Sequence, residues 1–269
     1  MKVSIVIPAY NEEKRIGKTL RAYMEYFDSL TKQKKLGYEI LVVINNTKDK
    51  TEKVVKSFQK KNNKILYLNF KRGGKGFAVI EGFKDALKRK NDAVGFVDAD
   101  MATSPEAYYH LIKRLEEFDG AIADRYMKGA KIFPAFSFRR IVVSRIFNFL
   151  VRTLFHFSYY DTQCGAKVFK RNVINHIVSE FTITQWAFDI DILYIAKKHG
   201  FALCSVPTHW TEKRGSKLNI IKTSIEMFFA IIQLRILRSP FARFLKIANP
   251  VVRVTYSILT RQYGKHSHL

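Results

Sequence analysis

Two carboxylates separated by one residue, Asp98 and Asp100, are the first candidates for chemistry in this chain. They follow the apolar run 93–97, which predicts a buried strand. They precede Ser104-Pro105-Glu106, which have the residue types of a helix N-cap, first position and first turn. Ligands of open α/β sheets bind beyond the carboxyl ends of strands, and Mg²⁺ takes one or two carboxylates together with water and phosphate oxygens. A solvated turn explains an isolated Asp-x-Asp at least as well, so the other elements must decide.

A glycine-rich basic segment precedes a second predicted helix, at about 77–90. Its residues are Lys71-Arg72-Gly73-Gly74-Lys75-Gly76. Exposed N–H groups and the helix dipole suit phosphate oxygens at such a place. It is not a Walker A loop, because Lys75 is followed by glycine rather than Ser or Thr. By itself, a plain glycine-rich turn is an equally good interpretation.

Predicted strands and helices alternate along most of the chain. The strands are at 3–7, 39–44, 65–68, 93–97, 120–123, 166–169 and 201–206, with long helices at 136–157 and 185–199. Residues 207–217 are expected to form a polar, basic loop. This alternation predicts an α/β fold with a mostly parallel, doubly wound central sheet flanked by helices.

The charge distribution indicates an anionic partner. The chain has 47 Lys and Arg against 23 Asp and Glu, a net charge of +24, and between 213 and 269 basic residues outnumber acidic ones eleven to one. Nucleotide phosphates, an acidic lipid surface and nucleic acid all fit this excess. The two cysteines are too few for a disulfide framework, which favours a reducing cytoplasm. No uncharged apolar run approaches the ~18 residues of a membrane span, so we expect none.

The last fifty residues differ from the rest in pattern. Ile and Phe residues recur at helical spacing from Leu218, and are followed by Arg235, Arg238, Arg243 and Lys246. A basic amphipathic segment of this kind is typical of helices that lie on an anionic bilayer. Packing on the domain or a homodimer contact are the alternatives. We expect a globular domain at 1–217, a helical tail at 218–269, and peripheral attachment to the cytoplasmic face of a membrane.

Several short stretches, in the same order, resemble the inverting nucleotide-sugar glycosyltransferases of family 2 type, and among them the dolichyl- and polyprenyl-phosphate sugar synthases. The stretches are Ile5-Val6-Ile7-Pro8-Ala9-Tyr10-Asn11-Glu12-Glu13, Gly74-Lys75-Gly76, Asp98-Ala99-Asp100-Met101-Ala102-Thr103, Asp161-Thr162-Gln163-Cys164-Gly165-Ala166-Lys167, Trp186-Ala187-Phe188-Asp189 and Gly215-Ser216-Lys217-Leu218. The last four are most similar to the dolichyl-phosphate β-glucosyltransferases. The resemblance covers about residues 1–220 and implies a Rossmann-like GT-A fold.

The resemblance also implies roles for individual residues. The nucleotide-sugar is expected at Pro8, Ala9, Tyr10, Glu12, Asn45, Lys75, Asp98, Ala99, Asp100 and Lys217, and Mg²⁺ or Mn²⁺ at Asp98 and Asp100. The acceptor phosphate is expected at Arg125, Arg140 and Ser144, of which the last two are four residues apart and so share a helix face. Asp161 is the candidate for orienting the nucleophile or acting as its base, and Asp189 is a second one. A backbone-bonded turn for Asp161, a surface arginine for Arg140 and a solvated helix face for Asp189 and Asp191 are the plain structural alternatives.

Two departures from the family pattern stand out. Ile44-Asn45 replaces two acids, and because an asparagine amide donates as well as accepts, the selectivity for the base stays open. Ala102 stands where mannosyl-transferring relatives often have Gln, so more water is expected around the metal.

The reaction implied is transfer of glucose or GlcNAc from a UDP-sugar to dolichyl or polyprenyl phosphate, for protein or surface glycosylation. A lipid phosphate is already anionic, so the difficulty is to bring two anions together, and a metal and a cluster of cations meet it. The alternatives are a GDP-mannose donor, a non-catalytic transferase-like subunit, and a nucleic-acid-binding protein. We expect no nucleic acid, because Asp98 and Asp100 would repel its phosphates.

Overall fold

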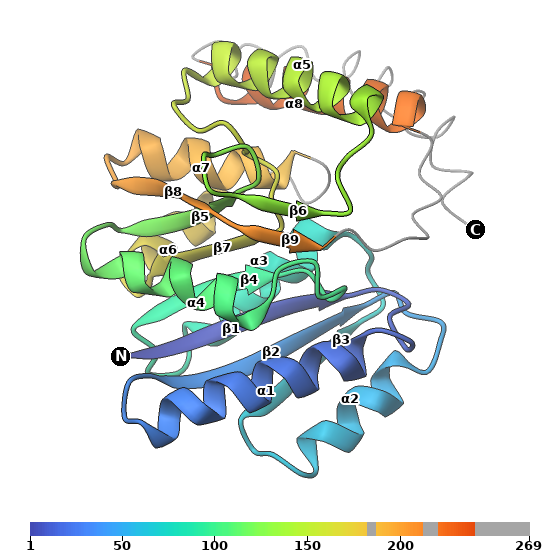
Figure 1. The fold of residues 1–269 in the computed structure, drawn as a ribbon, viewed down its shortest axis with the longest axis vertical. Coiled ribbons are helices and arrows are strands. Elements are labelled where there is room, and N and C mark those ends of the chain that lie inside the picture. The colour runs from blue at the N-terminus through green and yellow to red at the C-terminus, as the bar shows by residue number, and fades with distance from the viewer. Residues whose placement is uncertain (182–186, 212–219, 240–269) are drawn as a thin grey trace.

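The computed structural model describes residues 1–181, 187–211 and 220–239, apart from the side chains at 139 and 220–225. A seven-stranded sheet runs through the molecule in the order β3-β2-β1-β4-β7-β5-β8 (Figure 1). Its strands are β1 (Lys2–Ala9), β2 (Gly37–Asn45), β3 (Ile65–Phe70), β4 (Ala93–Val97), β5 (Gly120–Asp124), β7 (Ala166–Lys170) and β8 (Leu203–Pro207). Only β7 is antiparallel to its neighbours in this sheet. The predicted α/β class with a mostly parallel sheet is confirmed.

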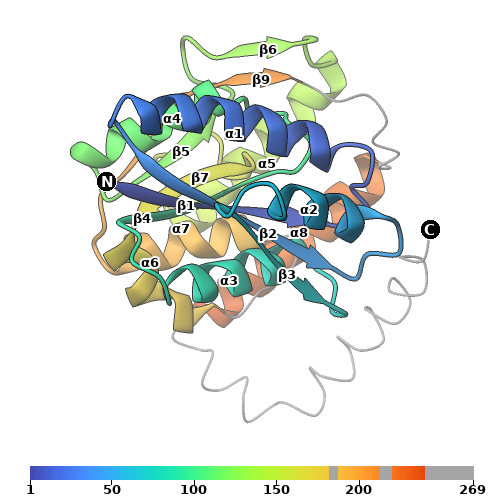
Figure 2. The same cartoon turned by 90° about the horizontal axis from the view of Figure 1, so that it is seen from below.

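Helices cover both faces of the sheet. They are α1 (Ile16–Lys32), α2 (Thr51–Gln59), α3 (Lys75–Ala86), α4 (Pro105–Lys113), α5 (Phe138–Phe155), α6 (Arg171–Ile177), α7 (Phe188–Lys198) and α8 (Ile220–Leu237), with short 3₁₀ turns η1 (Arg114–Glu116) and η2 (Val178–Glu180). Figure 2 shows α1 and α4 on one side of the strands and α3 and α6 on the other. Because both faces are covered, the parallel strands β1 and β2 are apolar and buried almost throughout.

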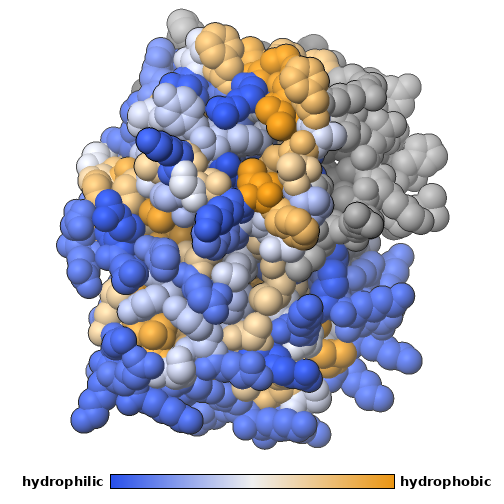
Figure 3. Space-filling model, in the orientation of Figure 1, coloured by the Kyte–Doolittle hydropathy of each residue, from blue (hydrophilic) through white to orange (hydrophobic). Residues whose placement is uncertain are grey.

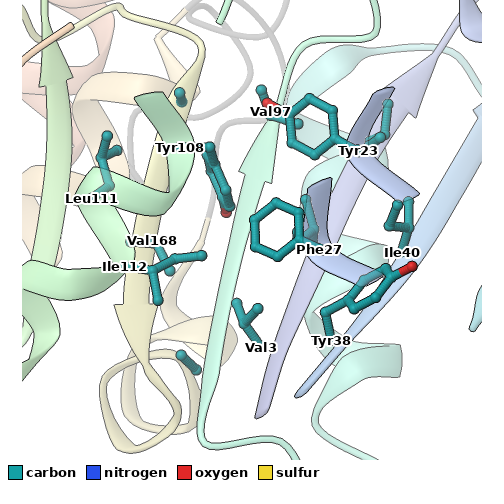
Figure 4. Packing of buried hydrophobic residues seen from close by; sticks show 14 of the residues in the cluster. Val3, Tyr23, Phe27, Tyr38, Ile40, Val97, Tyr108, Leu111, Ile112 and Val168 are labelled. Atoms are coloured by element: carbon teal, nitrogen blue, oxygen red, sulfur yellow. The ribbon is translucent and has the colours of Figure 1, made fainter. Parts of the chain in front are cut away.

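Two hydrophobic clusters fill the two sides. The first joins the sheet to α1, α2 and α4, and the second joins it to α3, α5, α6, α7 and α8. In the first cluster Tyr23 and Phe27 of α1 stack with ring centroids 6.0 Å apart, and the ring of Tyr108 of α4 lies 6.1 Å from that of Tyr23 on the same face of the sheet (Figure 4). This packing fixes α1 and α4 relative to β4, and so fixes the loop that joins β4 to α4.

A second sheet of two strands lies beside that loop. It pairs β6 (Lys131–Phe133) in parallel with β9 (His209–Thr211). The loop predicted at 207–217 is therefore wrong at 209–211, which form β9, and residues 212–217 lie outside the described part. Three-residue strands carry almost no periodic signal, and the partner of β9 is far away in sequence, so the pairing exists only in the folded chain.

The first helix of the predicted tail is packed on the rest of the protein. Ile231 and Leu234 of α8 are buried in the second cluster, and α8 lies beside α5 (Figure 1). The guanidinium of Arg238 donates to both carboxylate oxygens of Asp191 in α7, over 2.8 and 2.9 Å. The division at residue 217 stays a prediction, and residues 240–269 lie outside the described part. Among the described residues, no helix is long and apolar enough to cross a bilayer.

Candidate active site

Asp98 and Asp100 follow β4 directly, at the carboxyl edge of the sheet, as predicted. The predicted cap of the next helix is confirmed, because Ser104 Oγ accepts from the N–H of Ala107 over 3.2 Å. Helix α1 also contacts the turn, at the residue between Asp98 and Asp100. Its Thr19 hydroxyl donates to the carbonyl of Ala99 over 2.6 Å. The turn that carries the two carboxylates is therefore held by the hydrogen bond from Thr19 and by the capped start of α4.

The loop after β1 faces this turn. Pro8 and Ala9 end β1, and the ring of Tyr10 beyond them is exposed. The N–H of Glu12 donates to the Thr51 hydroxyl over 2.8 Å, which ties the loop to the start of α2. The predicted donor residues of this loop are thus held next to the ends of β1 and β2.

Asp100 and Glu12 are held in an environment that disfavours their charge. Burial raises the pKa of Asp100, and the carboxylate of Asp98 raises it further. Burial likewise raises the pKa of Glu12; Asp100 and Asp98 add to this, while Arg15, hydrogen-bonded to both Glu12 oxygens over 2.6 Å, opposes it. The carboxylates of Asp98, Asp100 and Glu12 are therefore close enough to repel one another, and a divalent cation at Asp98 and Asp100 would relieve this repulsion.

The donor set defines what kind of ion fits. Among the described residues, no three His, Cys, Asp or Glu side chains are placed to hold a metal by themselves. Asp98 and Asp100 alone would leave most positions of a metal to water and ligand oxygens, which is the coordination that Mg²⁺ accepts readily. The residues present therefore fit a cation that binds together with a phosphorylated ligand.

Lys75 already neutralises one of the two aspartates. Its Nζ lies 2.7 Å from Asp98 Oδ1 at the start of α3, with the side chain 40% exposed. Burial disfavours its charged form, but Asp98 and Asp189 outweigh this and raise the pKa of the amine. A charged lysine at a helix N-terminus, beside the acids, is placed to meet phosphate oxygens.

Asn45 is engaged within the protein. With the amide orientation that its neighbours require, Asn45 donates to the carbonyl of Ala9 over 3.0 Å and accepts from the N–H of Gly74 over 3.1 Å. The side chain is almost completely buried. In this arrangement it joins β1, β2 and the glycine-rich loop, and its predicted contact with a base stays a prediction.

Asp189 and Asp191 are both buried, so the solvated-face interpretation is wrong. Asp189 lies 2.6 Å from Nζ of Lys167, whose side chain is completely buried. The same amine donates to the carbonyl of Cys164 over 2.8 Å. Burial raises the pKa of the Cys164 thiol to about 12, which fits a packing residue and not a nucleophile.

A second charged group forms at the end of β5. Arg125 binds the completely buried carboxylate of Asp161 with Nε over 2.7 Å, with Nη2 over 2.9 Å and with its backbone N–H over 3.1 Å. Burial raises the pKa of Asp161, but the charge and hydrogen bonds of Arg125 outweigh burial and lower it. Asp161 is thus an anion fixed to Arg125, and this geometry fits an orienting group better than a base.

The three predicted acceptor residues lie in one region. The guanidinium groups of Arg140 and Arg125 both lie against the ring of Phe136, at 4.3 and 6.0 Å from its centroid. Burial lowers the pKa of Arg140, and the charge of Arg125 lowers it further. The hydroxyl of Ser144 contacts the hydroxyl of Tyr126, the neighbour of Arg125. Two arginines that repel each other and pack on the same aromatic ring are suited to bind a phosphate, because its negative charge would relieve the repulsion.

Some residues of the site had no role in the sequence analysis. They are Tyr126, Phe136, Lys167 and Trp210. Lys167 ends the motif that begins at Asp161, and Tyr126 follows the predicted acceptor residue Arg125, so for these two the sequence offered a signal. Lys217, with Lys213 and Arg214 of the same predicted basic loop, lies outside the described residues.

The fold is of the GT-A type, and comparisons with known proteins identify the family to which the chain belongs. Residues 4–178 match glycosyl transferase family 2. The dolichyl-phosphate β-glucosyltransferase of Dictyostelium discoideum is 32% identical over 87% of this chain and 73% of its own. That of Drosophila melanogaster is 32% identical over 84% and 72%. The chain belongs to glycosyl transferase family 2, with the dolichyl-phosphate β-glucosyltransferases as relatives, which confirms the resemblance seen in the motifs.

Among solved structures, the fold is similar to that of glucosyl-3-phosphoglycerate synthase from Mycobacterium tuberculosis. The TM-score is 0.65, over 87% of this chain and 78% of that one, at 17% sequence identity. That enzyme was crystallised with Mn²⁺, uridine diphosphate and phosphoglyceric acid. At this identity the likeness establishes the fold alone.

Proposed function

We propose that this protein is a metal-dependent inverting glycosyltransferase that moves glucose or GlcNAc from a UDP-sugar to dolichyl or another polyprenyl phosphate. The observation that carries the proposal is the division of the site into two parts. Asp98, Asp100 and Lys75 stand at the end of β4 and the start of α3, while Arg125 and Arg140 stand beyond β5. One part suits a metal-bound diphosphate and the other an anionic acceptor.

On the donor side, Asp98 and Asp100 would hold Mg²⁺ or Mn²⁺. Such a cation supplies charge neutralisation to the leaving nucleoside diphosphate. Lys75 lies beside Asp98 and can move its ammonium group to the diphosphate oxygens. The glycine-rich backbone before α3 leaves room for them, because Gly74 has a φ of +120° and no side chain.

On the acceptor side, the guanidinium of Arg125 is held by Asp161 so that it faces the acceptor region in one orientation. An oxygen of the lipid phosphate attacks the anomeric carbon of the sugar from the side opposite the diphosphate. The new C–O bond forms as the bond to the diphosphate breaks, and the electrons of that bond leave with the nucleoside diphosphate. Since the phosphate is already ionised, no proton must be removed. Asp161 is then an orienting group, which agrees with its lowered pKa.

The surface of α5 and α8 supports a lipid acceptor. On α5 the side chains of Phe138, Ile141, Val142, Ile146 and Phe149 are exposed, and on α8 those of Phe228, Phe229, Ile236 and Leu237. Apolar side chains gather at the top of Figure 3, where α5 lies in Figure 1. Arg140 and Arg145 lie among them. Apolar residues mixed with arginine suit the interface of an anionic bilayer, so we place the protein peripherally on the cytoplasmic face of a membrane.

The test is transfer of labelled sugar into an organic-solvent extract. Purified protein is incubated with polyprenyl phosphate, Mg²⁺ or Mn²⁺, and UDP-glucose, UDP-GlcNAc or GDP-mannose in parallel. We expect transfer from a UDP-sugar, abolished by a chelator and by Asp100→Ala. Transfer from GDP-mannose alone would overturn the donor. Nucleotide binding without transfer to lipid would overturn the acceptor, and absence of both would overturn the enzyme.

A further inference from the structure

Trp210 on β9 is attached to the turn that carries the two aspartates. It forms an antiparallel bridge with Thr103, and the N–H of the next residue, Thr211, donates to the carbonyl of Ala102 over 2.9 Å. On its other edge β9 pairs with β6, where Ile132 is opposite Trp210. The backbone of Trp210 is therefore part of the same structure as the end of the Asp98–Thr103 turn.

The side chain of Trp210 points to the other half of the site. The centre of its ring lies 4.9 Å from Cζ of Arg125, closer than the rings of Tyr126 at 5.8 Å and Phe136 at 6.0 Å. Asp161 binds the Nε and Nη2 edge of this guanidinium. An edge-on carboxylate and an aromatic face restrain different rotations of the group, so both are needed to fix one orientation.

The indole N–H takes no part in this arrangement. Nε1 of Trp210 is buried and has no hydrogen-bond partner among the described residues. The ring therefore acts through its aromatic face and its volume. This distinction matters for the test, because phenylalanine retains a face and loses only the N–H group.

We propose that Trp210 is a positioning residue that couples the two halves of the site. Its strand moves with the Asp98–Thr103 turn while its ring sets the orientation of Arg125, so that occupancy of the turn and binding of the acceptor phosphate depend on each other. The inference rests on the proposed function, since it takes Asp98 and Asp100 as the donor side and Arg125 as the acceptor side. Because coupling of affinities is reciprocal, it is measurable from either ligand.

The first experiment measures coupling by titration. The dissociation constant of UDP with Mg²⁺ is determined with and without a short-chain polyprenyl phosphate, by calorimetry. In the wild-type protein we expect the acceptor to change it by a factor of roughly 5 or more. Trp210→Ala and Trp210→Leu should bring this factor close to unity while UDP still binds, and Trp210→Phe should largely retain it. Phe133→Ala, an aromatic change on the paired strand β6, is the matched control and should leave it unchanged.

The second experiment separates the kinetic constants. Trp210→Leu should raise KM for the acceptor roughly tenfold, with a smaller change in KM for the donor, and in combination with Arg125→Ala it should add little to the effect of Arg125→Ala alone. The chain has two tryptophans, Trp186 and Trp210. Trp186→Phe therefore isolates the Trp210 emission, which should change on adding UDP with Mg²⁺ and change again with the acceptor.

The outcomes are distinguishable. If the wild-type protein transfers sugar to lipid phosphate, and Trp210→Leu binds UDP but keeps the acceptor KM and the coupling factor, the inference is overturned and the proposed function stands. If the wild-type protein binds UDP and transfers nothing to lipid phosphate, the proposed function fails and the inference fails with it. Thermal unfolding of each variant shows whether it is folded. If Trp210→Ala and Trp210→Leu are unfolded, the Trp210 emission in the Trp186→Phe variant carries the test, because an emission that does not change on adding UDP with Mg²⁺ would overturn the inference.

Discussion

Gly165 approaches Asp98 so closely that a Cβ on Gly165 would lie 1.8 Å from Oδ2 of Asp98. The backbone makes the same contact, because the N–H of Asp98 donates to the carbonyl of Gly165 over 3.1 Å. The carboxylate of Asp98 thus packs directly against the backbone of the loop that begins with Asp161. The loop that contains Asp161 is linked in this way to the turn that contains Asp98.

Gly165→Ala should therefore displace the Asp98 carboxylate. Because a shift of about 1 Å at a reacting site costs on the order of 10²-fold in rate, we expect kcat/KM to fall by about that factor. Mn²⁺ binding, followed by electron paramagnetic resonance, should weaken in parallel. Gly37→Ala is the control, since its added Cβ has no neighbour closer than 3.6 Å. Unchanged Mn²⁺ binding in Gly165→Ala would contradict the assignment of Asp98 to the metal.

Asp161→Asn should lower the free energy of unfolding by about 3–5 kcal/mol, because it leaves the guanidinium of Arg125 unpaired in a site where that side chain is 13% exposed. Glu52→Gln, which breaks the exposed pair with Lys56, should have a far smaller effect, because water screens both charges. Both are measured by urea unfolding. Equal effects in the two variants would show that the Arg125–Asp161 pair does not stabilise the fold.

The same pair predicts a pH dependence of stability. The pKa of Asp161 in the folded protein is below its ordinary value of 3.8. Its stabilising effect is therefore fully present above that value and is lost as the pH falls through the lower, folded pKa. Unfolding of the wild type across the acidic range should show this loss, and Asp161→Asn should show a shallower fall. Parallel curves would mean that another carboxylate is responsible.

Metal binding should respond to acid earlier than an ordinary aspartate allows. A cation binds the ionised carboxylate, and the pKa of Asp100 is raised by burial and by Asp98. Mn²⁺ affinity should thus begin to fall at a pH above the ordinary range of Asp. Asp98→Asn removes the neighbouring charge, so the fall should move to lower pH while the affinity drops at all pH values. A fall that does not move would show that neither Asp100 nor Glu12 governs it, because Asp98 raises the pKa of both carboxyl groups.

The exposed apolar side chains of α5 should contribute to membrane binding. Phe138→Ser and Phe149→Ser remove rings that are 82% and 65% exposed. Each should reduce partition onto anionic vesicles roughly tenfold, since burying such a side chain contributes about 1.5–3 kcal/mol. Phe133→Ser, 77% exposed outside α5 and α8, is the control. If all three variants still bind vesicles and the wild-type protein forms a dimer that depends on concentration, the exposed surface of α5 is a homodimer contact instead.

Features of this protein that depend only on neighbouring residues were predictable from the amino-acid sequence. Mainly apolar runs of five or six residues, at 3–7, 39–44 and 93–97, specified β1, β2 and β4, and Ser104-Pro105 specified the start of α4. These signals are local, because strand periodicity and helix capping act over a few residues. The same locality placed Asp98 and Asp100 at the carboxyl edge of the sheet and made the family recognisable from motifs in order.

The pairing of the charged site residues, by contrast, is visible only in the folded chain. Arg125 and Asp161 are 36 residues apart, and Lys167 and Asp189 are 22 apart. Nothing in the local sequence distinguishes a buried, ion-paired aspartate from one on a solvated face. The strand β9, which joins Thr103 to Arg125 through Trp210, is too short to have a periodicity. Such contacts depend on long-range packing of the whole sheet, and for that reason the partner of each charge became known only from the folded chain.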